Sequence, residues 1–186
     1  MNTSDGVDTR ERILAEAEEL WREGGTRALT MRAVAGRVGV TATALYRHFA
    51  GKKELVGELR ARAERLLEGY LERALQGRTP RERLGLAGRA YLDFGLQQPR
   101  VYGILISTRE PAEGAGLFLA ERVRECMEER WLRPGDPEDV ARTIRSLLHG
   151  LISLQLSDGL GLDEAGFRAL YVRSMNRLFE GLGDTT

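Results

Sequence analysis

Apolar residues recur along most of the chain at intervals of three and four positions, the spacing that places them on one face of an α-helix. In the first such segment the apolar face consists of Ile13, Leu14, Ala17, Leu20 and Trp21. Asp8 followed by Glu11 matches a capping box and predicts the start of this helix, and the Gly24–Gly25 pair predicts its end. The pattern therefore predicts an amphipathic helix near the beginning of the chain.

The same spacing continues toward the other end of the chain and predicts a series of further helices. They cover residues 31–38, 42–49, 52–74, 84–97, 100–107, 117–131 and 138–156, and a last helix follows residue 163. Thr30, Thr41 and Asp163 are expected to be N-caps, because their side-chain oxygens can accept a hydrogen bond from the first turn. Pro80 is expected to close the long helix, and a turn-rich loop is expected over 107–116. No segment alternates as a strand does, so the predicted fold class is all-α.

Residues 30–49 meet the steric requirements of a helix-turn-helix. Two helices that cross steeply need a small side chain at their contact, which Ala35 provides, and the turn needs a residue that tolerates positive φ, which Gly39 provides. Apolar residues on both sides, among them Val38 and Leu45, are spaced to pack the second helix against the first. The alternative is an amphipathic hairpin in a structural bundle, which can place alanine and glycine in the same way.

Charge is distributed unevenly, although the chain of 186 residues is neutral overall with 28 basic and 28 acidic residues. Between positions 24 and 53 there are six basic residues and no acidic one, which leaves 22 basic against 28 acidic residues elsewhere. The basic residues of this window are Arg27, Arg32, Arg37, Arg47, Lys52 and Lys53. A local charge of +6 in an otherwise acidic chain is typical of an element that binds a polyanion such as DNA. A solvated basic surface without a partner is the other interpretation.

Composition removes several other classes of protein. A hydrophobic fraction of 42% with 30% charged residues is that of a globular chain and not of a disordered one. The single cysteine, Cys126, excludes an internal disulfide, and the two histidines form no recognisable metal site with it. No apolar run approaches the roughly 18 residues of a membrane span, and the polar N-terminus is unlike a signal peptide. A cytoplasmic protein without a membrane, metal or cofactor partner is therefore expected.

A longer motif overlaps the basic window and consists of Gly39-Val40-Thr41-Ala42-Thr43-Ala44-Leu45-Tyr46-Arg47-His48-Phe49 followed by Lys52-Lys53-Glu54-Leu55. It resembles the signature of TetR-family transcriptional regulators, as does the run over 24–32 before it, and short segments over 90–103 and 148–151 resemble one C-terminal subtype of that family. The resemblance implies a homodimeric repressor with two domains. The expected N-terminal three-helix DNA-binding domain covers residues 1–58, and a C-terminal helical bundle for ligand binding and dimerisation covers 59–186.

The motif supplies a set of candidate DNA contacts. They are Arg32, Thr41, Ala42, Thr43, Tyr46, Arg47, His48, Lys52 and Lys53. Residues 41–43 open the third helix, the part of a recognition helix that reaches base edges, whereas Tyr46 and His48 lie further along and suit phosphates. The two lysines stand where the amides at the start of the next helix favour a phosphate. Alanine at positions 42 and 44 departs from the usual family pattern, so a contribution from DNA shape is expected.

The second half of the chain supplies aromatic and apolar residues that suit a ligand pocket. The candidate ligand-binding residues are Tyr91, Phe94, Tyr102, Ile106, Phe118, Trp131 and His149, and ordinary core burial is the alternative for each of them. The last two predicted helices are too apolar to face water. Their candidate dimer-interface residues are Leu147, Leu151, Leu154, Phe167, Leu170, Tyr171 and Leu178. Isologous packing against a second copy explains this apolar excess, and burial in the chain's own core is the alternative.

These observations predict a ligand-responsive transcriptional regulator, a repressor that binds a pseudopalindromic operator on double-stranded DNA as a homodimer. A small hydrophobic molecule is expected to release it. The alternative is an all-α enzyme or a protein-interaction adaptor whose N-terminal hairpin is structural. No catalytic residue is expected, because neither His48 nor His149 has a nucleophile or metal-ligand partner nearby in the sequence.

Overall fold

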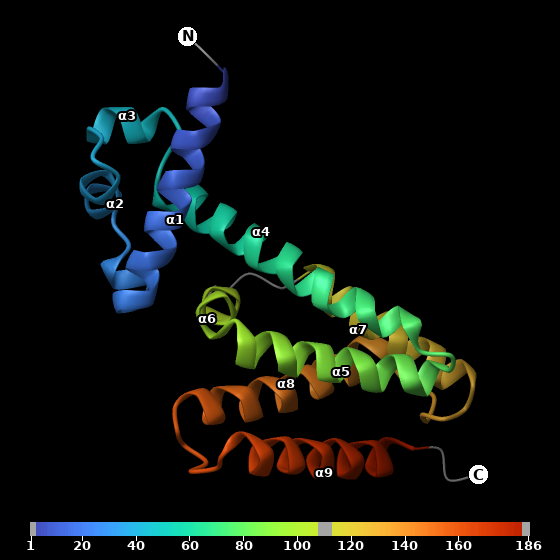
Figure 1. The fold of residues 1–186 in the computed structure, drawn as a ribbon. Coiled ribbons are helices and arrows are strands. Elements are labelled where there is room, and N and C mark those ends of the chain that lie inside the picture. The colour runs from blue at the N-terminus through green and yellow to red at the C-terminus, as the bar shows by residue number, and fades with distance from the viewer. Residues whose placement is uncertain (1–2, 108–112, 184–186) are drawn as a thin grey trace. The chain divides into compact units, whose positions relative to one another are not determined.

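The structure, a computed structural model, describes residues 3–107 and 113–183, with side chains described over 9–107 and 114–183. Helices account for most of these ranges and no strand occurs within them, which confirms the all-α prediction. In chain order (Figure 1) the elements are α1 (Thr3–Ala28), α2 (Met31–Val38), α3 (Ala42–Tyr46), α4 (Lys52–Leu71), the 3-10 helix η1 (Glu72–Gln76), α5 (Pro80–Gln97), α6 (Pro99–Ser107), α7 (Glu113–Glu128), α8 (Pro137–Leu156) and α9 (Glu164–Leu182).

The chain divides into two compact units. The first unit comprises Met1–Arg65 and Arg100–Arg109, and so contains α1 to α3 and most of α4 and α6. The second unit comprises Leu66–Pro99 and Glu110–Thr186, with the end of α4, η1, α5 and α7 to α9. Two helices therefore contribute residues to both units: α4, which is divided after Arg65, and α6, of which only the first residue, Pro99, belongs to the second unit.

The core of the first unit forms where the apolar faces of its helices meet. Its buried residues are Ile13, Leu14, Ala17, Leu20, Trp21, Leu29, Val34, Ala35, Val38, Leu45, Phe49, Leu55, Leu59 and Ile104. All five residues of the predicted apolar face of α1 belong to this core. Burial of one large aliphatic side chain is worth about 1.5–3 kcal/mol, so the core stabilises α2 and α3, which are too short to be stable alone.

The first helix differs from its prediction at the start and agrees with it at the end. α1 begins at Thr3, so Asp8 lies inside the helix and the capping box predicted there is wrong. Each residue added to an existing helix gains a backbone hydrogen bond, and that gain carries the helix back through the polar residues before Asp8. Gly24 (φ −157°, ψ 23°) and Gly25 (φ 61°, ψ −151°) are not helical, and they interrupt α1 where the sequence predicted an end.

The third helix is shorter than predicted, because it ends at Tyr46 and not near residue 49. After it, the amides of Arg47 and His48 donate to carbonyl oxygens three positions earlier, those of Ala44 and Leu45. Such bonds belong to tighter 3-10 turns, which close the end of the helix without extending it.

The fifth helix starts earlier than predicted, at Pro80. The amide of Glu82 donates to the hydroxyl oxygen of Thr79, and the Glu82 carboxylate accepts from the Thr79 amide, which together form a capping box. Proline suits the first position of a helix because that position needs no donor, so Pro80 begins a helix here and does not only end one. Similarly, Gly114 lies inside α7 and not in the predicted loop, whereas Pro111 falls outside the described residues.

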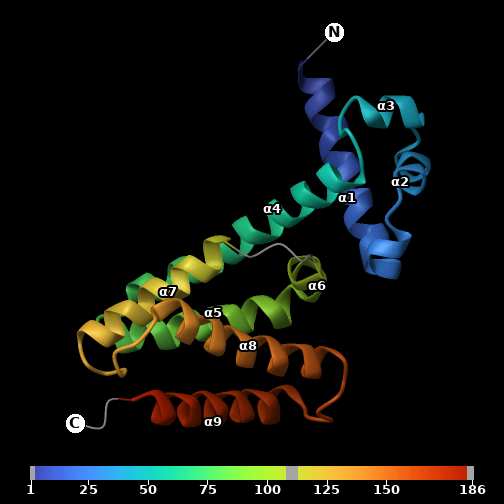
Figure 2. The same ribbon diagram turned by 180° about the vertical axis from the view of Figure 1, so that it is seen from behind.

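The second unit packs around α5, which contacts both α7 and α8, and these two helices also pack against each other (Figure 2). Glycine allows two close approaches to α5. A Cβ on Gly95 would lie 2.7 Å from Cγ2 of Ile152 in α8, and a Cβ on Gly88 would lie 2.7 Å from the hydroxyl oxygen of Tyr171 in α9. Asp163 caps α9 as predicted, by accepting from the amide of Gly166 at 2.8 Å.

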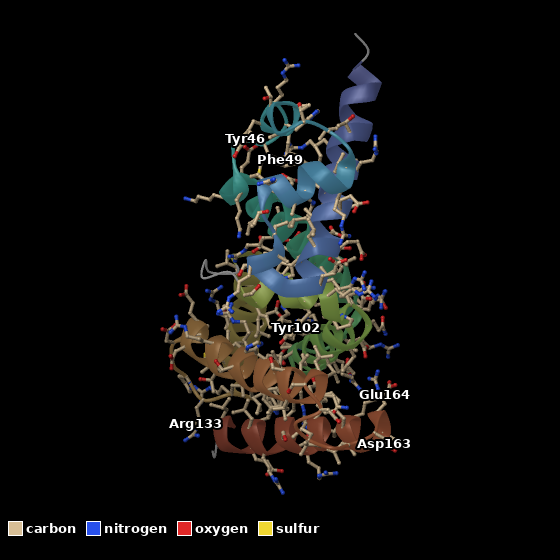
Figure 3. All side chains as sticks on the ribbon, turned by 90° about the vertical axis from the view of Figure 1, so that its left-hand side faces the viewer. Tyr46, Phe49, Tyr102, Arg133, Asp163 and Glu164 are labelled. Atoms are coloured by element: carbon tan, nitrogen blue, oxygen red, sulfur yellow. The ribbon has the colours of Figure 1, made fainter. Side chains whose placement is uncertain are left out.

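The last two helices form an antiparallel hairpin, with α9 alongside α8 (Figure 1 and Figure 3). The end of α9 is joined to the segment after α7 by a backbone hydrogen bond of 3.0 Å from Arg133 to Leu182 and by an isolated bridge between Leu132 and Gly183. Within the described ranges, no helix combines the length and the apolar character needed to cross a membrane.

Candidate nucleic-acid interface

The turn between α2 and α3 has the geometry that the sequence predicts for a helix-turn-helix. Thr30 caps α2 by accepting from the amide of Ala33 at 3.1 Å. Gly39 ends the helix with φ 76° and ψ 30°, and the amides of Gly39 and Val40 both donate to the carbonyl oxygen of Ala35 at 3.0 Å. Because this φ is in the left-handed region, a side chain at position 39 would be strained.

One face of α3 is buried and the other is exposed. Leu45 and the following Phe49 lie in the core, whereas Ala42, Thr43 and Tyr46 face outward. Tyr46 is 52% exposed, and Figure 3 shows where it lies relative to Phe49. The outward face therefore carries residues that the sequence assigned to DNA contact, at the start of a helix that the core holds in place.

Thr41 has the structural role that the sequence predicted, in addition to its expected contact with DNA. Its hydroxyl oxygen accepts a hydrogen bond of 3.1 Å from the amide of Ala44 and so caps α3. The hydroxyl hydrogen is not used by this cap, so Thr41 keeps one donor for a phosphate or a base.

Four of the predicted DNA contacts are lysines and arginines of this unit, and they differ in whether the charged group already has a partner within the protein. Arg32, Arg47 and Lys53 are exposed, and among the described residues none of them has an ion-pair partner. Lys52 is exposed too, but its ammonium donates to the backbone carbonyl of Thr26. His48 is partly buried, and its backbone carbonyl accepts from Arg10. The free cations can bind a phosphate without giving up an internal partner.

Arg37 is neutralised within the unit. Its guanidinium lies 2.7 Å from Oε1 of Glu23 and 3.9 Å from a carboxylate oxygen of Glu16. The hydrogen bond from Arg37 lowers the pKa of Glu23 and so stabilises its ionised form. The charge of +6 counted along the sequence therefore overstates what a polyanion meets, because the fold brings acidic residues from α1 to the basic window.

Two arginines of α1, which no motif in the sequence marks, hold the helix-turn-helix in place. Arg10 donates to the carbonyl of His48 at 2.8 Å, lies 3.5 Å from the carboxylate of Glu58, and covers the ring of Phe49 with 4.2 Å to its centroid. Arg12 donates to the carbonyl of Val38 at 3.1 Å. These carbonyls lie at the ends of α3 and α2. The partners are 38 and 26 residues away in sequence, so no local pattern predicts them.

The candidate ligand residues are divided between the two units. Tyr102 and Ile106 belong to the first, where Tyr102 is fully buried and Ile106 is 40% exposed. Of the others, Tyr91 and Phe94 are buried in the second unit, and the Phe94 ring meets that of Tyr70 edge-on with centroids 5.5 Å apart. Burial of this kind is what the core alternative predicts for Tyr91 and Phe94.

The remaining candidates are partly buried in the second unit. The guanidinium of Arg122 lies over the ring of Phe118, 5.0 Å from the ring centroid. The rings of Trp131 and Phe179 are in contact, with their centroids 5.2 Å apart. Trp131 also lines a groove between α5 and α9. His149 lies with its Nδ1 3.4 Å from the hydroxyl of Ser153.

The surroundings of two titratable groups of the second unit favour the neutral form of each. Burial, with the positive charge of Arg145 nearby, lowers the pKa of His149. Burial, reinforced by Glu125 and Glu129, raises the pKa of the Cys126 thiol to about 12. A buried cysteine of this kind acts as a small apolar side chain. Across the described residues, no three His, Cys, Asp or Glu side chains are grouped so as to hold a metal ion.

The candidate dimer-interface residues fall into two sets. Phe167, Tyr171 and Leu151 are buried within the single chain. Leu147, Leu170 and Leu178 are partly buried and Leu154 is 47% exposed, and the apolar surface of α8 and α9 continues through Leu156 and Val172, which are also exposed. The first set therefore fits the core alternative, and the second remains available for contact with another copy.

Comparison with known proteins matches both parts of the chain. Residues 13–59 match the model described as bacterial regulatory proteins, tetR family, and residues 84–178 match the model of the tetracyclin repressor-like C-terminal domain. The first match contains the whole helix-turn-helix, and the second runs from within α5 to within α9.

Solved structures of similar fold cover nearly the whole chain. A protein of unknown function from Rhodococcus sp. RHA1 is 21% identical, with a TM-score of 0.79 over 94% of this chain and 95% of that one. The ketosteroid transcriptional regulator KstR2 of Mycobacterium tuberculosis is 20% identical, with a TM-score of 0.66 over 94% of each chain. The TetR-family regulator PfmR of Thermus thermophilus is 23% identical, with a TM-score of 0.71 over 93% of this chain and 96% of that one. With its two family matches and its helix-turn-helix, this chain belongs to the tetR family of bacterial regulatory proteins.

Proposed function

We propose that this protein is a ligand-responsive transcriptional repressor that binds a pseudopalindromic operator as a homodimer. Residues 1–58 would bind DNA, and residues 59–186 would bind the effector and form the dimer. A regulator of this kind acts in the cytoplasm, where bacterial DNA is found. Family membership favours this function over an all-α enzyme or an adaptor.

The observation that carries the proposal is the outward face of α3. It presents Ala42, Thr43 and Tyr46 on a helix fixed by a threonine cap and a glycine turn, with the unpaired cations of Arg47 and Lys53 nearby in the chain. The first turn of a recognition helix reaches base edges in the major groove, while cations around it bind phosphates. Thr43 can hydrogen-bond a base or place its methyl group on that of a thymine.

Because α3 is a single short helix, the sequence specificity of the proposed regulator comes from a homodimer, which presents two such helices to the operator. Two copies related by a two-fold axis would place two α3 helices in successive major grooves, about 34 Å apart. The apolar side chains that α8 and α9 leave partly exposed, Leu147, Leu154, Leu170 and Leu178, supply the surface for the second copy. Isologous packing would bury this surface in both protomers at once.

The response to an effector requires a difference in free energy between two conformers. α4 contributes residues to both compact units, so a ligand that favours one setting of α4 would change the spacing of the two α3 helices in the dimer. A tenfold loss of operator affinity needs about 1.4 kcal/mol of differential binding, which is within the usual range of allosteric coupling.

Selection of bound duplexes from a random DNA pool tests this function. We expect recovery of a two-fold symmetric site, with affinity that falls steeply as salt rises because phosphate contacts release counterions. A folded protein that enriches no sequence would favour the all-α enzyme or the adaptor.

A further inference from the structure

A groove with a volume of about 860 Å³ lies within the second unit, between the first half of α5 and the last turns of α9. Arg81 and Arg89 line it from α5, and Asn176, Phe179 and Glu180 line it from α9. Trp131, which follows α7, also lines it. Figure 3 labels Arg133, close to this end of α9, and Asp163 and Glu164 at the opposite end. The volume is that of a small-molecule site, about 300–1,000 Å³.

The apolar part of the groove is built from two aromatic rings. Trp131 and Phe179 contact each other with centroids 5.2 Å apart and their planes inclined at 51°. The guanidinium of Arg81 lies 5.0 Å from the centroid of Trp131, so a positive charge already rests on this aromatic surface. A flat ring can enter beside them and gain both aromatic contact and a cationic neighbour.

The charged part of the groove contains two arginines and two glutamates, and the two arginines offer free N–H donors. Arg81 and Arg89 are exposed, and neither has an ion-pair partner among the described residues. The carboxylate of Glu82, which also lines the groove, already accepts from the amides of Arg78 and Thr79 at 2.8 and 3.4 Å. The groove therefore offers two guanidinium groups whose N–H donors make no ion pair within the described residues, while part of the acceptor capacity of Glu82 is already used by backbone amides.

We propose that this groove binds a small planar aromatic carboxylate. Its carboxylate would accept paired hydrogen bonds from Arg89 or Arg81, since the planar guanidinium matches a carboxylate with two parallel N–H donors. Its ring would lie against Trp131 and Phe179, and the amide of Asn176 would hydrogen-bond a polar substituent. Apart from Trp131, none of the residues that line the groove belongs to the aromatic set predicted for the effector.

Binding in this groove does not depend on DNA recognition, whereas the idea that the ligand acts as an effector rests on the proposed function. The two parts are therefore measured separately. The protein contains two tryptophans, Trp131 in the groove and Trp21 in the core of the first unit, so their indole N–H resonances report on different places. A Trp131→Phe variant assigns the two signals.

The test titrates the protein with 2-naphthoate and, as a neutral isostere, with 2-naphthamide. We expect a saturable shift of the Trp131 indole signal, no shift of the Trp21 signal, and weaker binding of the amide. At least one of Arg89→Gln and Arg81→Gln should weaken binding of the acid about three- to tenfold, because the arginine that pairs with the carboxylate loses its charge-assisted bonds. Arg142→Gln, an exposed arginine of α8 outside the groove, should leave it unchanged.

An unmoved Trp131 signal, equal binding of acid and amide, or full affinity in both arginine variants would overturn the proposal. Melting curves confirm that the variants are folded, which is expected because both side chains are exposed. The second part measures operator affinity with and without saturating 2-naphthoate. Saturation at Trp131 without any change in operator affinity would overturn the effector role alone, and a protein that binds no operator in the absence of the ligand would overturn the proposed function instead.

Discussion

The guanidinium of Arg10 covers the ring of Phe49, 4.2 Å from its centroid, and so ties the first helix to the residue that closes the helix-turn-helix. The same group donates to the carbonyl of His48 at 2.8 Å, one residue earlier. Arg10 thus acts as a positioning residue: it binds the end of the α3 segment and not the exposed face that is proposed to meet DNA.

Replacement of Arg10 by glutamine should weaken operator binding without changing its salt dependence. The variant loses the contacts with Phe49 and with the His48 carbonyl, at a cost of about 1 kcal/mol in the free energy of unfolding. Binding measured over a range of salt concentrations separates this role from a phosphate contact, since only a lost phosphate contact lowers the slope of log K against log salt. A slope reduced by about one would show that Arg10 binds phosphate. Arg22→Gln, on the same helix and paired with Glu19, is the control.

The two adjacent lysines should differ when each is replaced by glutamine. Both variants should lower the salt slope by about one if both ammonium groups bind phosphate. Only Lys52→Gln should also lower the melting temperature, because Lys52 alone of the pair donates to the carbonyl of Thr26. Equal melting temperatures would refute the structural role of Lys52, and an unchanged slope in Lys53→Gln would remove it from the interface. Arg124→Gln in α7 serves as a control for loss of one charge.

Gly95→Ala should destabilise the second unit, although alanine favours a helix. The added Cβ would lie 2.7 Å from Cγ2 of Ile152, and overpacking of this kind costs about 1–3 kcal/mol, more than the gain in helix propensity of about 1 kcal/mol. Gly85→Ala on the same helix is the matched control, because nothing lies within 4 Å of its Cβ. Denaturant unfolding should therefore show opposite signs for the two variants, and stabilisation by Gly95→Ala would refute the close approach of α5 and α8.

Cys126 should resist alkylation in the folded protein. With a pKa raised to about 12 by burial, the thiol is almost entirely protonated at pH 8, and the thiolate is the reactive form. The raised pKa means that the thiolate fraction increases only as the pH approaches this value. Labelling with iodoacetamide at pH 8 should be at least about a hundredfold slower in the native protein than in guanidinium. Equal rates would show that the site is open to solvent.

The sequence predicted those parts of the structure that depend on residues close together in the chain. Thr30, Gly39 and Asp163 have the cap and turn roles expected of them, because each makes its hydrogen bonds within four or five positions. The apolar face of α1 was also predictable, since helical periodicity alone defines it. Pro80 was misplaced for a related reason: proline can end one helix or begin the next, and only the capping box of Thr79 with Glu82 decides between them.

Contacts between distant residues were not predictable from one sequence. The basic window over 24–53 has no acidic residue of its own, but the fold brings carboxylates of α1 to it, as the pair of Arg37 with Glu23 shows. The charge counted along the sequence is therefore larger than the charge that a polyanion meets. The buried state of Phe167 could not be told from an interface, because both a core and a dimer need the same apolar periodicity. Of the candidate site, the outward face of α3 was predicted and its support by Arg10 and Arg12 was not.

The most direct test of the central claim, that the exposed face of α3 reads DNA sequence, is to repeat the duplex selection with Thr43→Ala and with Tyr46→Phe. We expect Thr43→Ala to relax the base preference at one pair of symmetry-related operator positions by about 1–3 kcal/mol, and Tyr46→Phe to weaken binding to all sequences alike. If both variants recover the wild-type site with wild-type affinity, α3 does not contact the operator through these side chains and the account is wrong.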